Sequence, residues 1–374
     1  MKKYSLIVFI TTLIMNLAGF FPPFCDLYTE RVYGYIADAF GFLWSKVPFA
    51  IGEILMYLAA ALLVFLIILG ILFIFLRKHK GYASFAGAFA KSMLCIFVTV
   101  LFLYTLNWSL PMRSSLMGEG KKAEREYTLA EYEILRNFIT QNMNEAVCEV
   151  QRDAEGNIVL PGRGEAREKI EASMKALGAE YPRLKGYYPP VKEALCSDVL
   201  DWMDIGGYTY PYTMEVTCNK YITDLYYPAL YAHESSHHQG FYRESEANFI
   251  EFLACAKSDD PRIRLAGYIY IYGYVDNAYQ SKLMEACDKD EAIARYDSQI
   301  QVDPQVSIDQ AYARKLAKAV YDQDEHPLEK YSDTAEKVAD KGWSTQERIL
   351  QENNYDGVVP ILLGYFYEDH ENGK

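Results

Sequence analysis

Histidine and cysteine are scarce in this chain of 374 residues. It has 6 histidines and 7 cysteines, and no two cysteines form a C-x-x-C pair. That absence disfavours a zinc ribbon or another structural metal site built on paired cysteines. The sequence also has no repeat of fixed period and no low-complexity tract, so we do not expect a repeat architecture.

Positive charge is scarce after residue 111. The whole chain carries a net charge of −13. Residues 1–111 contain eight Lys or Arg and four Asp or Glu, so the negative charge lies in residues 112–374, which carry −17. An acidic domain is repelled by phosphate backbones, and we therefore expect no nucleic-acid partner.

Long apolar runs are confined to the N-terminal third of the chain. They cover residues 4–21, 51–76 and 86–106, and about 20 apolar residues suffice to cross a bilayer as a helix. A signal peptide is the alternative for the first run, but no clear A-x-A cleavage site follows it. We predict three transmembrane helices in a membrane domain of residues 1–111.

Two basic clusters give the expected orientation in the membrane. Met1-Lys-Lys and Arg77-Lys-His-Lys80 flank the first two apolar runs, and Lys and Arg at the ends of spans favour the cytoplasmic side. The loop at residues 22–47 then lies outside. We expect a multi-pass protein of the cell membrane whose second domain, residues 112–374, is extracytoplasmic.

One short stretch concentrates the scarce histidines. His233, Glu234 and His237 form the motif H-E-x-x-H, and His238 follows directly. Residues four apart lie on one face of a helix, so the imidazoles of His233 and His237 can bind one ion. Imidazoles are typical zinc ligands, and Glu234 is placed to take a proton from a water whose pKa zinc lowers to about 7. His238 points about 100° away from His237, which makes it a bystander.

A catalytic zinc site needs a third protein ligand, and the acidic residues that follow are the candidates. Gly240 is expected to end the first helix, and Glu244 and Glu246 lie at the start of a second one. Glu244 is the predicted ligand. Glu246 faces a different side of the same helix and is the reserve. Apolar flanks such as Leu230 and Phe249 favour a buried site over a solvated helix.

One strand is expected before this stretch. Residues 206–218 are rich in β-branched and aromatic side chains, and within them Thr213 to Thr217 is predicted to be a strand. Two interpretations are open at this point. The strand either lies at a sheet edge and pairs with an extended substrate, or it belongs to a plain hairpin in the core.

The same residues resemble known peptidase families. H-E-x-x-H followed by E-x-x-A-N, here Glu244 to Asn248, resembles the ImmA/IrrE metallopeptidases, and the HtpX-like membrane proteases have a similar E-x-x-A-D. This resemblance implies a zincin of the gluzincin type, with Glu244 as third zinc ligand and Asn248 supporting the site. A metzincin would place its third histidine at Arg243, which cannot bind zinc.

A further resemblance covers most of the chain. The pattern H-E-x-x-H-x-x-G-F-x-x-E-x-E-A-N-F, found from His233 to Phe249, resembles that of the bacterial membrane family called domain of unknown function 3810. The membrane-proximal segment Pro48-Phe-Ala-Ile-Gly-Glu53 is also similar to a motif of that family. The family name implies no substrate.

These observations predict a mainly α protein, with three N-terminal transmembrane helices followed by a zincin-like α+β metallopeptidase domain that has a small β-sheet. The expected function is hydrolysis of peptide bonds, with His233, His237 and Glu244 holding Zn²⁺ and Glu234 as general base. The expected partners are a peptide or protein substrate and the lipid bilayer. The alternative is a non-catalytic membrane-anchored metal-binding or signalling protein, whose closed site would have four protein ligands.

The charge bias makes a testable prediction about topology. A reporter that is active only outside the cytoplasm should be active when fused after Lys374 and inactive when fused near Lys80, because the basic cluster at Arg77 to Lys80 is retained inside. Reporter activity of the two fusions in intact cells is the measurement. The reverse pattern would place residues 112–374 in the cytoplasm.

Overall fold

The computed structural model describes residues 2–115, 126–327, 329–350 and 357–371. The chain is mainly helical, with one three-stranded sheet, and it divides into two compact units. The first unit contains residues 1–115 together with two later segments, 187–195 and 209–217. The second unit contains the rest. This division differs from a boundary at residue 111, because two segments of the predicted extracytoplasmic domain belong to the first unit.

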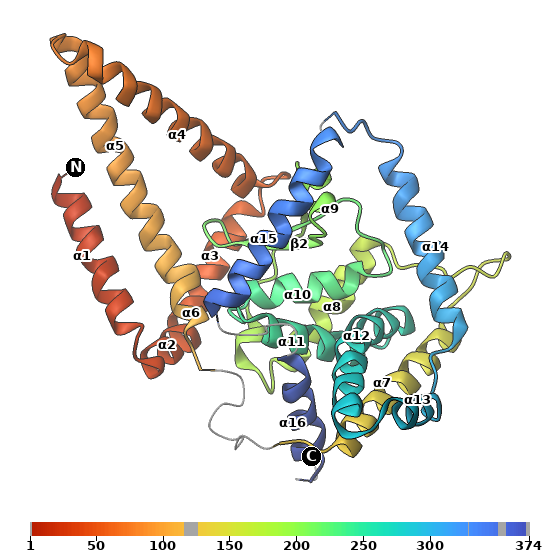
Figure 1. Cartoon of the computed structure of the whole chain (residues 1–374). Helices are drawn as coiled ribbons and strands as arrows, with labels where there is room; N and C mark the ends of the chain where they lie inside the picture. The colour runs from red at the N-terminus through yellow and green to blue at the C-terminus, as the bar shows by residue number, and fades with distance from the viewer. Residues whose placement is uncertain (1, 116–125, 328, 351–356, 372–374) are drawn as a thin grey trace. The chain divides into compact units, whose positions relative to one another are not determined.

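The helices of the first unit all come from its N-terminal segment, residues 1–115 (Figure 1). They are α1 (Lys2–Ala18), α2 (Pro22–Tyr28), the π-helical η1 (Thr29–Tyr33), α3 (Gly34–Trp44), α4 (Ile51–Leu76), α5 (Lys80–Tyr104), the π-helical η2 (Thr105–Ser109) and α6 (Leu110–Met112).

Two of these helices are long and apolar enough to cross a membrane. They are α4, which matches the predicted span 51–76, and the continuous helix Lys80–Met112, which is longer than the predicted 86–106. The predicted span 4–21 corresponds to α1, which ends at Ala18 and is joined to Pro22–Trp44 by a bend of 116°. Two prolines begin the new helix there, because proline cannot donate the hydrogen bonds of a helix interior. Two helices, or three if the bent pair counts as one span, could therefore cross a membrane.

The N-terminus of α4 is capped by a glutamate that lies far away in the sequence. The carboxylate of Glu215 accepts hydrogen bonds from the backbone N–H groups of Ile51 (3.0 Å) and Gly52 (2.7 Å). These N–H groups have no partner within the helix, and an anion is favoured at this positive end of the helix dipole. The segment Pro48 to Glu53, which resembles a family motif, therefore contains the N-terminus of α4. The buried carboxylate of Glu215 caps this N-terminus.

Lys192 neutralises this buried carboxylate. Its ammonium group donates hydrogen bonds to Glu215 and to the backbone carbonyls of Trp44 (2.9 Å) and Phe49 (3.0 Å). Lys192 is only 5% exposed and Glu215 2%, so each charge depends on the other to remain buried. The three donors of the ammonium group are thus all used.

The sheet has the strand order β1-β3-β2, with β1 at Lys192–Glu193, β2 at Gly207–Tyr210 and β3 at Glu215–Cys218. The predicted strand at Thr213 to Thr217 is β3, shifted by two residues at its start. It is the central strand, so both of its edges are already paired. The interpretation of β3 as an edge strand that binds substrate is therefore wrong, and the core interpretation is confirmed by its four buried residues.

The second unit is built from helices that surround one buried helix, α10. Its elements are α7 (Leu129–Glu149), α8 (Arg163–Leu177), the 3₁₀-helix η3 (Pro182–Lys185), α9 (Ser197–Trp202), α10 (Tyr227–His238), α11 (Glu244–Ala256), α12 (Pro261–Ala286), α13 (Lys289–Asp297), α14 (Pro304–Tyr321), the 3₁₀-helix η4 (Glu329–Tyr331), α15 (Ser332–Leu350) and α16 (Val358–Glu371).

Helices α8, α11 and α12 pack around α10, and α7 packs along α12 (Figure 1). Every residue of α10 except Leu230 is buried. Unpaired charges on a helix that is buried on all sides cost folding free energy. The polar residues of α10, which include the H-E-x-x-H motif, are therefore the feature of this unit that requires a functional explanation.

The buried ion pair of the first unit predicts a large effect of one substitution. Lys192→Met should lower the free energy of unfolding by about 3–5 kcal/mol, because it leaves the Glu215 carboxylate buried without its countercharge. Lys46→Met is the matched control, because Lys46 belongs to the same unit and is exposed. Thermal unfolding of the full chain in detergent measures both. Equal midpoints for the two variants would show that the pair contributes little.

Candidate metal centre

The turn that ends α10 is fixed by a glycine. Gly240 has a φ of +91°. This backbone conformation is strained for any residue that has a β-carbon. The N–H of Gly240 donates to the carbonyl of His237 (3.0 Å), and the N–H of Phe241 donates to that of Ser236 (3.0 Å). This pair of bonds is the Schellman motif, which turns the chain sharply at a helix end. The predicted helix break at Gly240 is thus confirmed.

The next helix, α11, begins at Glu244 and directs this carboxylate at both histidines. The Nε2 atom of His233 lies 3.1 Å from Oε2 of Glu244, and the Nε2 atom of His237 lies 3.7 Å from Oε1. One ligand atom from each of the three residues lies within 4.8 Å of the other two. We call His233, His237 and Glu244 the metal group.

The other ring nitrogen of each histidine has its own neighbour. Nδ1 of His237 lies 2.8 Å from the carbonyl oxygen of Phe241, to which it can donate as N–H. Nδ1 of His233 lies 3.4 Å from Oε2 of Glu251, a carboxylate two turns along α11 from Glu244. A neutral imidazole with its proton on Nδ1 presents a lone pair at Nε2. Both rings are therefore arranged to offer Nε2 as a ligand atom.

Burial and mutual attraction shape the protonation of these groups. Burial opposes a charge on His233, but the pairing with Glu244 and Glu251 prevails and raises its pKa well above the ordinary value. Burial raises the pKa of Glu244, but the attraction of His237 and His233 outweighs burial and lowers this pKa to about 2. Burial lowers the pKa of His237 to about 4 and raises that of Glu251 to about 7. A cation that binds beside Glu244 would therefore compete with a proton for His233.

The structure separates the two glutamates that the sequence left as alternatives. Glu244 belongs to the metal group, whereas Glu246 is buried on α11 and is not part of any such group among the described residues. His238 is buried on α10 and is likewise outside the group. Glu234 is 4% exposed on the same helix, and its negative charge is one of the influences that raise the pKa of His233.

Sequence reasoning missed three residues near the metal group. Glu251 is the first, and its signal was its spacing of seven from Glu244, which is two helical turns and hence the same face. The others are Tyr270 and Tyr274 on α12. Burial raises the pKa of both phenols, and the charges of Glu251 and Glu244 add to that effect. Both phenols therefore stay protonated as donors within electrostatic reach of Glu244.

A close approach of α11 and α12 supports this arrangement. A β-carbon at Gly267 on α12 would lie 2.4 Å from the β-carbon of Cys255 on α11, so only glycine allows this separation. Cys255 is one turn after Glu251 and is fully buried. Its side chain is small, which allows the close approach of α12 and helps to set the position of Glu251.

The donor set fits zinc. Zinc binds imidazole nitrogen and carboxylate oxygen at about 2.0–2.2 Å in a tetrahedral arrangement, which places neighbouring ligand atoms about 3–4 Å apart. The 3.1 Å and 3.7 Å separations within the metal group agree with that spacing. The carbonyl of Phe241 and the carboxylate of Glu251 lie beside Nδ1 of the two rings, where zinc-binding histidines usually have an acceptor.

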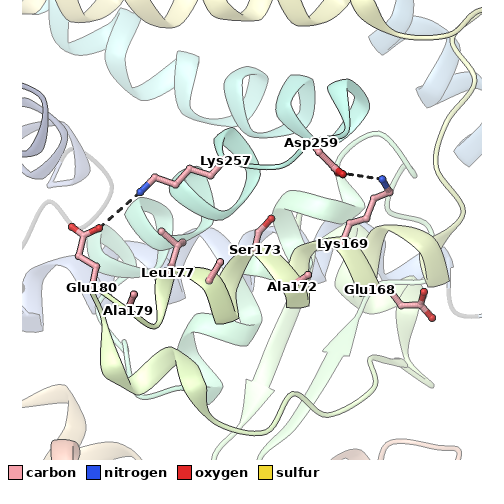
Figure 2. Close-up of a pocket in the computed structure, with 10 residues that line it drawn as sticks. Glu168, Lys169, Ala172, Ser173, Leu177, Ala179, Glu180, Lys257 and Asp259 are labelled. Atoms are coloured by element: carbon pink, nitrogen blue, oxygen red, sulfur yellow. Dashed lines mark hydrogen bonds and ion pairs between the residues drawn. The ribbon is translucent and has the colours of Figure 1, made fainter. Parts of the chain in front are cut away.

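A surface pocket of the second unit lies apart from the metal group. It has a volume of about 670 Å³ and lies between α8 and the end of α11 (Figure 2). Small side chains such as Ala172 line it, and two ion pairs flank it, Lys169 with Asp259 (3.3 Å) and Lys257 with Glu180 (3.9 Å). No member of the metal group lines this pocket, so it is not part of the candidate centre.

Comparison with known proteins gives one match. Residues 28–344 match the model of a family described as "Protein of unknown function (DUF3810)". The matched region contains the whole metal group and the start of α4. No curated protein and no solved structure matches the chain. Because the match covers most of the sequence, the chain belongs to the family "Protein of unknown function (DUF3810)".

Proposed function

We propose that this chain is a membrane-anchored zinc-dependent metallopeptidase with a zincin-like catalytic domain. The observation that carries the proposal is the convergence of Nε2 of His233, Nε2 of His237 and the carboxylate of Glu244 within 4.8 Å. The Nδ1 neighbours of both rings add support, because with Nδ1 directed at them it is Nε2 of each ring that faces Glu244. A zinc ion bound there would supply a Lewis acid and lower the pKa of a water to about 7.

The remaining chemistry is assigned to residues of α10 and α12. Glu234, next to His233, accepts a proton from the attacking water and passes it to the leaving amine. Tyr270 and Tyr274 are the candidates for donating a hydrogen bond to the oxyanion of the transition state, because burial keeps both phenols protonated. The substrate is a peptide or protein.

The alternative function, a non-catalytic metal-binding or signalling protein, requires a closed site with four protein ligands. Among the described residues the metal group has three members, and neither Glu246 nor His238 joins it. Three protein ligands leave a coordination position for water or substrate. This count favours the enzyme.

The apolar helices favour a position in the lipid bilayer. We propose that α1 forms a third span beside the two long helices. The basic residues at Arg77 to Lys80, which join α4 and α5, then lie in the cytoplasm, and the metal group lies on the opposite side of the membrane.

Metal content distinguishes the ligands from their neighbours. The full chain purified in detergent should hold one zinc per chain, and His233→Ala and Glu244→Ala should each lose it, because only two protein ligands remain. Glu246→Ala is the matched control on the same helix and should retain its zinc. Elemental analysis of the four proteins is the measurement. Loss of zinc in Glu246→Ala with retention in Glu244→Ala would make Glu246 the third ligand.

The role of Glu234 as general base predicts a loss of turnover without a loss of zinc. Glu234→Gln keeps the size of the side chain but removes the proton acceptor, so turnover should fall by roughly 10²–10⁴ or more while zinc content stays at the wild-type level. Cleavage of a peptide library by the full chain, together with zinc analysis, measures both properties. A variant that cleaves at the wild-type rate would remove Glu234 from the mechanism.

A further inference from the structure

Glu251 is a buried carboxylate beside a ring of the metal group. It is 1% exposed, and its Oε2 atom lies 3.4 Å from Nδ1 of His233. Among the residues that the structure describes, no side chain or backbone group donates a hydrogen bond of good geometry to either of its oxygens. A buried carboxylate costs free energy unless a neighbouring group pairs with its charge. The neighbour here is a ring of the metal group.

The Nδ1 atoms of the two histidines face different neighbours. His237 faces the neutral carbonyl of Phe241, which the turn at Gly240 places 2.8 Å from Nδ1. His233 faces the carboxylate of Glu251 instead. An anionic acceptor on Nδ1–H both fixes the orientation of an imidazole and makes its other nitrogen a stronger metal ligand.

The resemblance to known peptidases had implied Asn248 in the supporting role. Asn248 lies one turn after Glu244 and is fully buried, but its amide is not hydrogen-bonded to either histidine. Glu251 lies a further turn along α11, and it is the residue that contacts the ring. The close packing of Cys255 on Gly267 sets this part of α11 against α12.

We propose that Glu251 is a positioning residue, which holds His233 with Nε2 turned toward the metal position and strengthens it as a ligand. This inference rests on the proposed function, because it requires that the metal group binds zinc. It adds a second-sphere role that no motif of the sequence indicated.

The test is a graded series at position 251 in the full chain in detergent. Glu251→Gln keeps the shape and a weaker acceptor, and Glu251→Met keeps the approximate volume without an oxygen. Zinc affinity, measured by competition with a chromophoric chelator, should fall from wild type to Gln to Met, with a total loss of about 10–100-fold. The visible spectrum of bound Co²⁺ should shift in the same order. Thermal unfolding of the metal-free proteins should show no loss of stability, because a buried charge has been removed.

The matched control is the same pair of substitutions at Glu246, a second buried glutamate of α11, which should leave zinc affinity within about threefold. Wild-type affinity and an unchanged Co²⁺ spectrum in Glu251→Met would overturn the inference. A fall in affinity matched by an equal loss of stability in the metal-free protein would also overturn it, because the residue would then act through folding. If His233→Ala binds zinc as tightly as wild type, the proposed metal site itself fails, and this result is distinguishable from failure at Glu251 alone.

Discussion

The sharp turn between α10 and α11 is the constraint on which the candidate centre depends. Three ligand atoms from two helices must meet at one point, and the direction of the second helix is set within five residues of the first. Gly240 makes this turn with a φ of +91°. The same turn presents the carbonyl of Phe241 to Nδ1 of His237. One backbone conformation therefore brings Glu244 to the histidines and also orients one of their rings.

The first unit depends on a comparable long-range contact. Glu215 caps α4, and Lys192 neutralises Glu215, although 163 positions separate Glu215 from Gly52 and 148 separate Lys192 from Trp44. A soluble fragment that begins after residue 111 would lack the N–H groups that Glu215 binds and the carbonyls of Trp44 and Phe49 that Lys192 binds. Glu215 would keep Lys192 and the hydroxyl of Thr213, but each charge would lose its backbone partners, which is costly for buried groups. The full chain is therefore the proper material for biochemical work.

The local features of the site could be predicted from the sequence, because they depend on helical periodicity. The pairing of His233 with His237 and the helix break at Gly240 required only the spacing of residues and the preference of glycine for the left-handed region. The choice between Glu244 and Glu246 required the direction of α11 relative to α10, which no local pattern contains. Glu251 shares a face with Glu244, but a single glutamate within an apolar helix gave no reason to examine that spacing.

The sheet and the first apolar run also show features that local patterns do not predict. The central place of β3 is decided by β1, which is only two residues long and has no pattern that a sequence could reveal. The bend after Ala18 follows from the prolines at 22 and 23, yet the apolar run continues through it. Hydropathy alone therefore made this apolar run look like one straight helix.

X-ray absorption at the zinc edge of the metal-loaded full chain tests the central claim most directly. The arrangement of His233, His237 and Glu244 predicts a first shell of nitrogen and oxygen only, at about 2.0–2.2 Å, with the outer-ring scattering of two imidazoles. A sulfur shell at about 2.3 Å would mean that a cysteine binds the metal. A fit that requires no imidazole, or a chain that retains no zinc, would equally contradict the account.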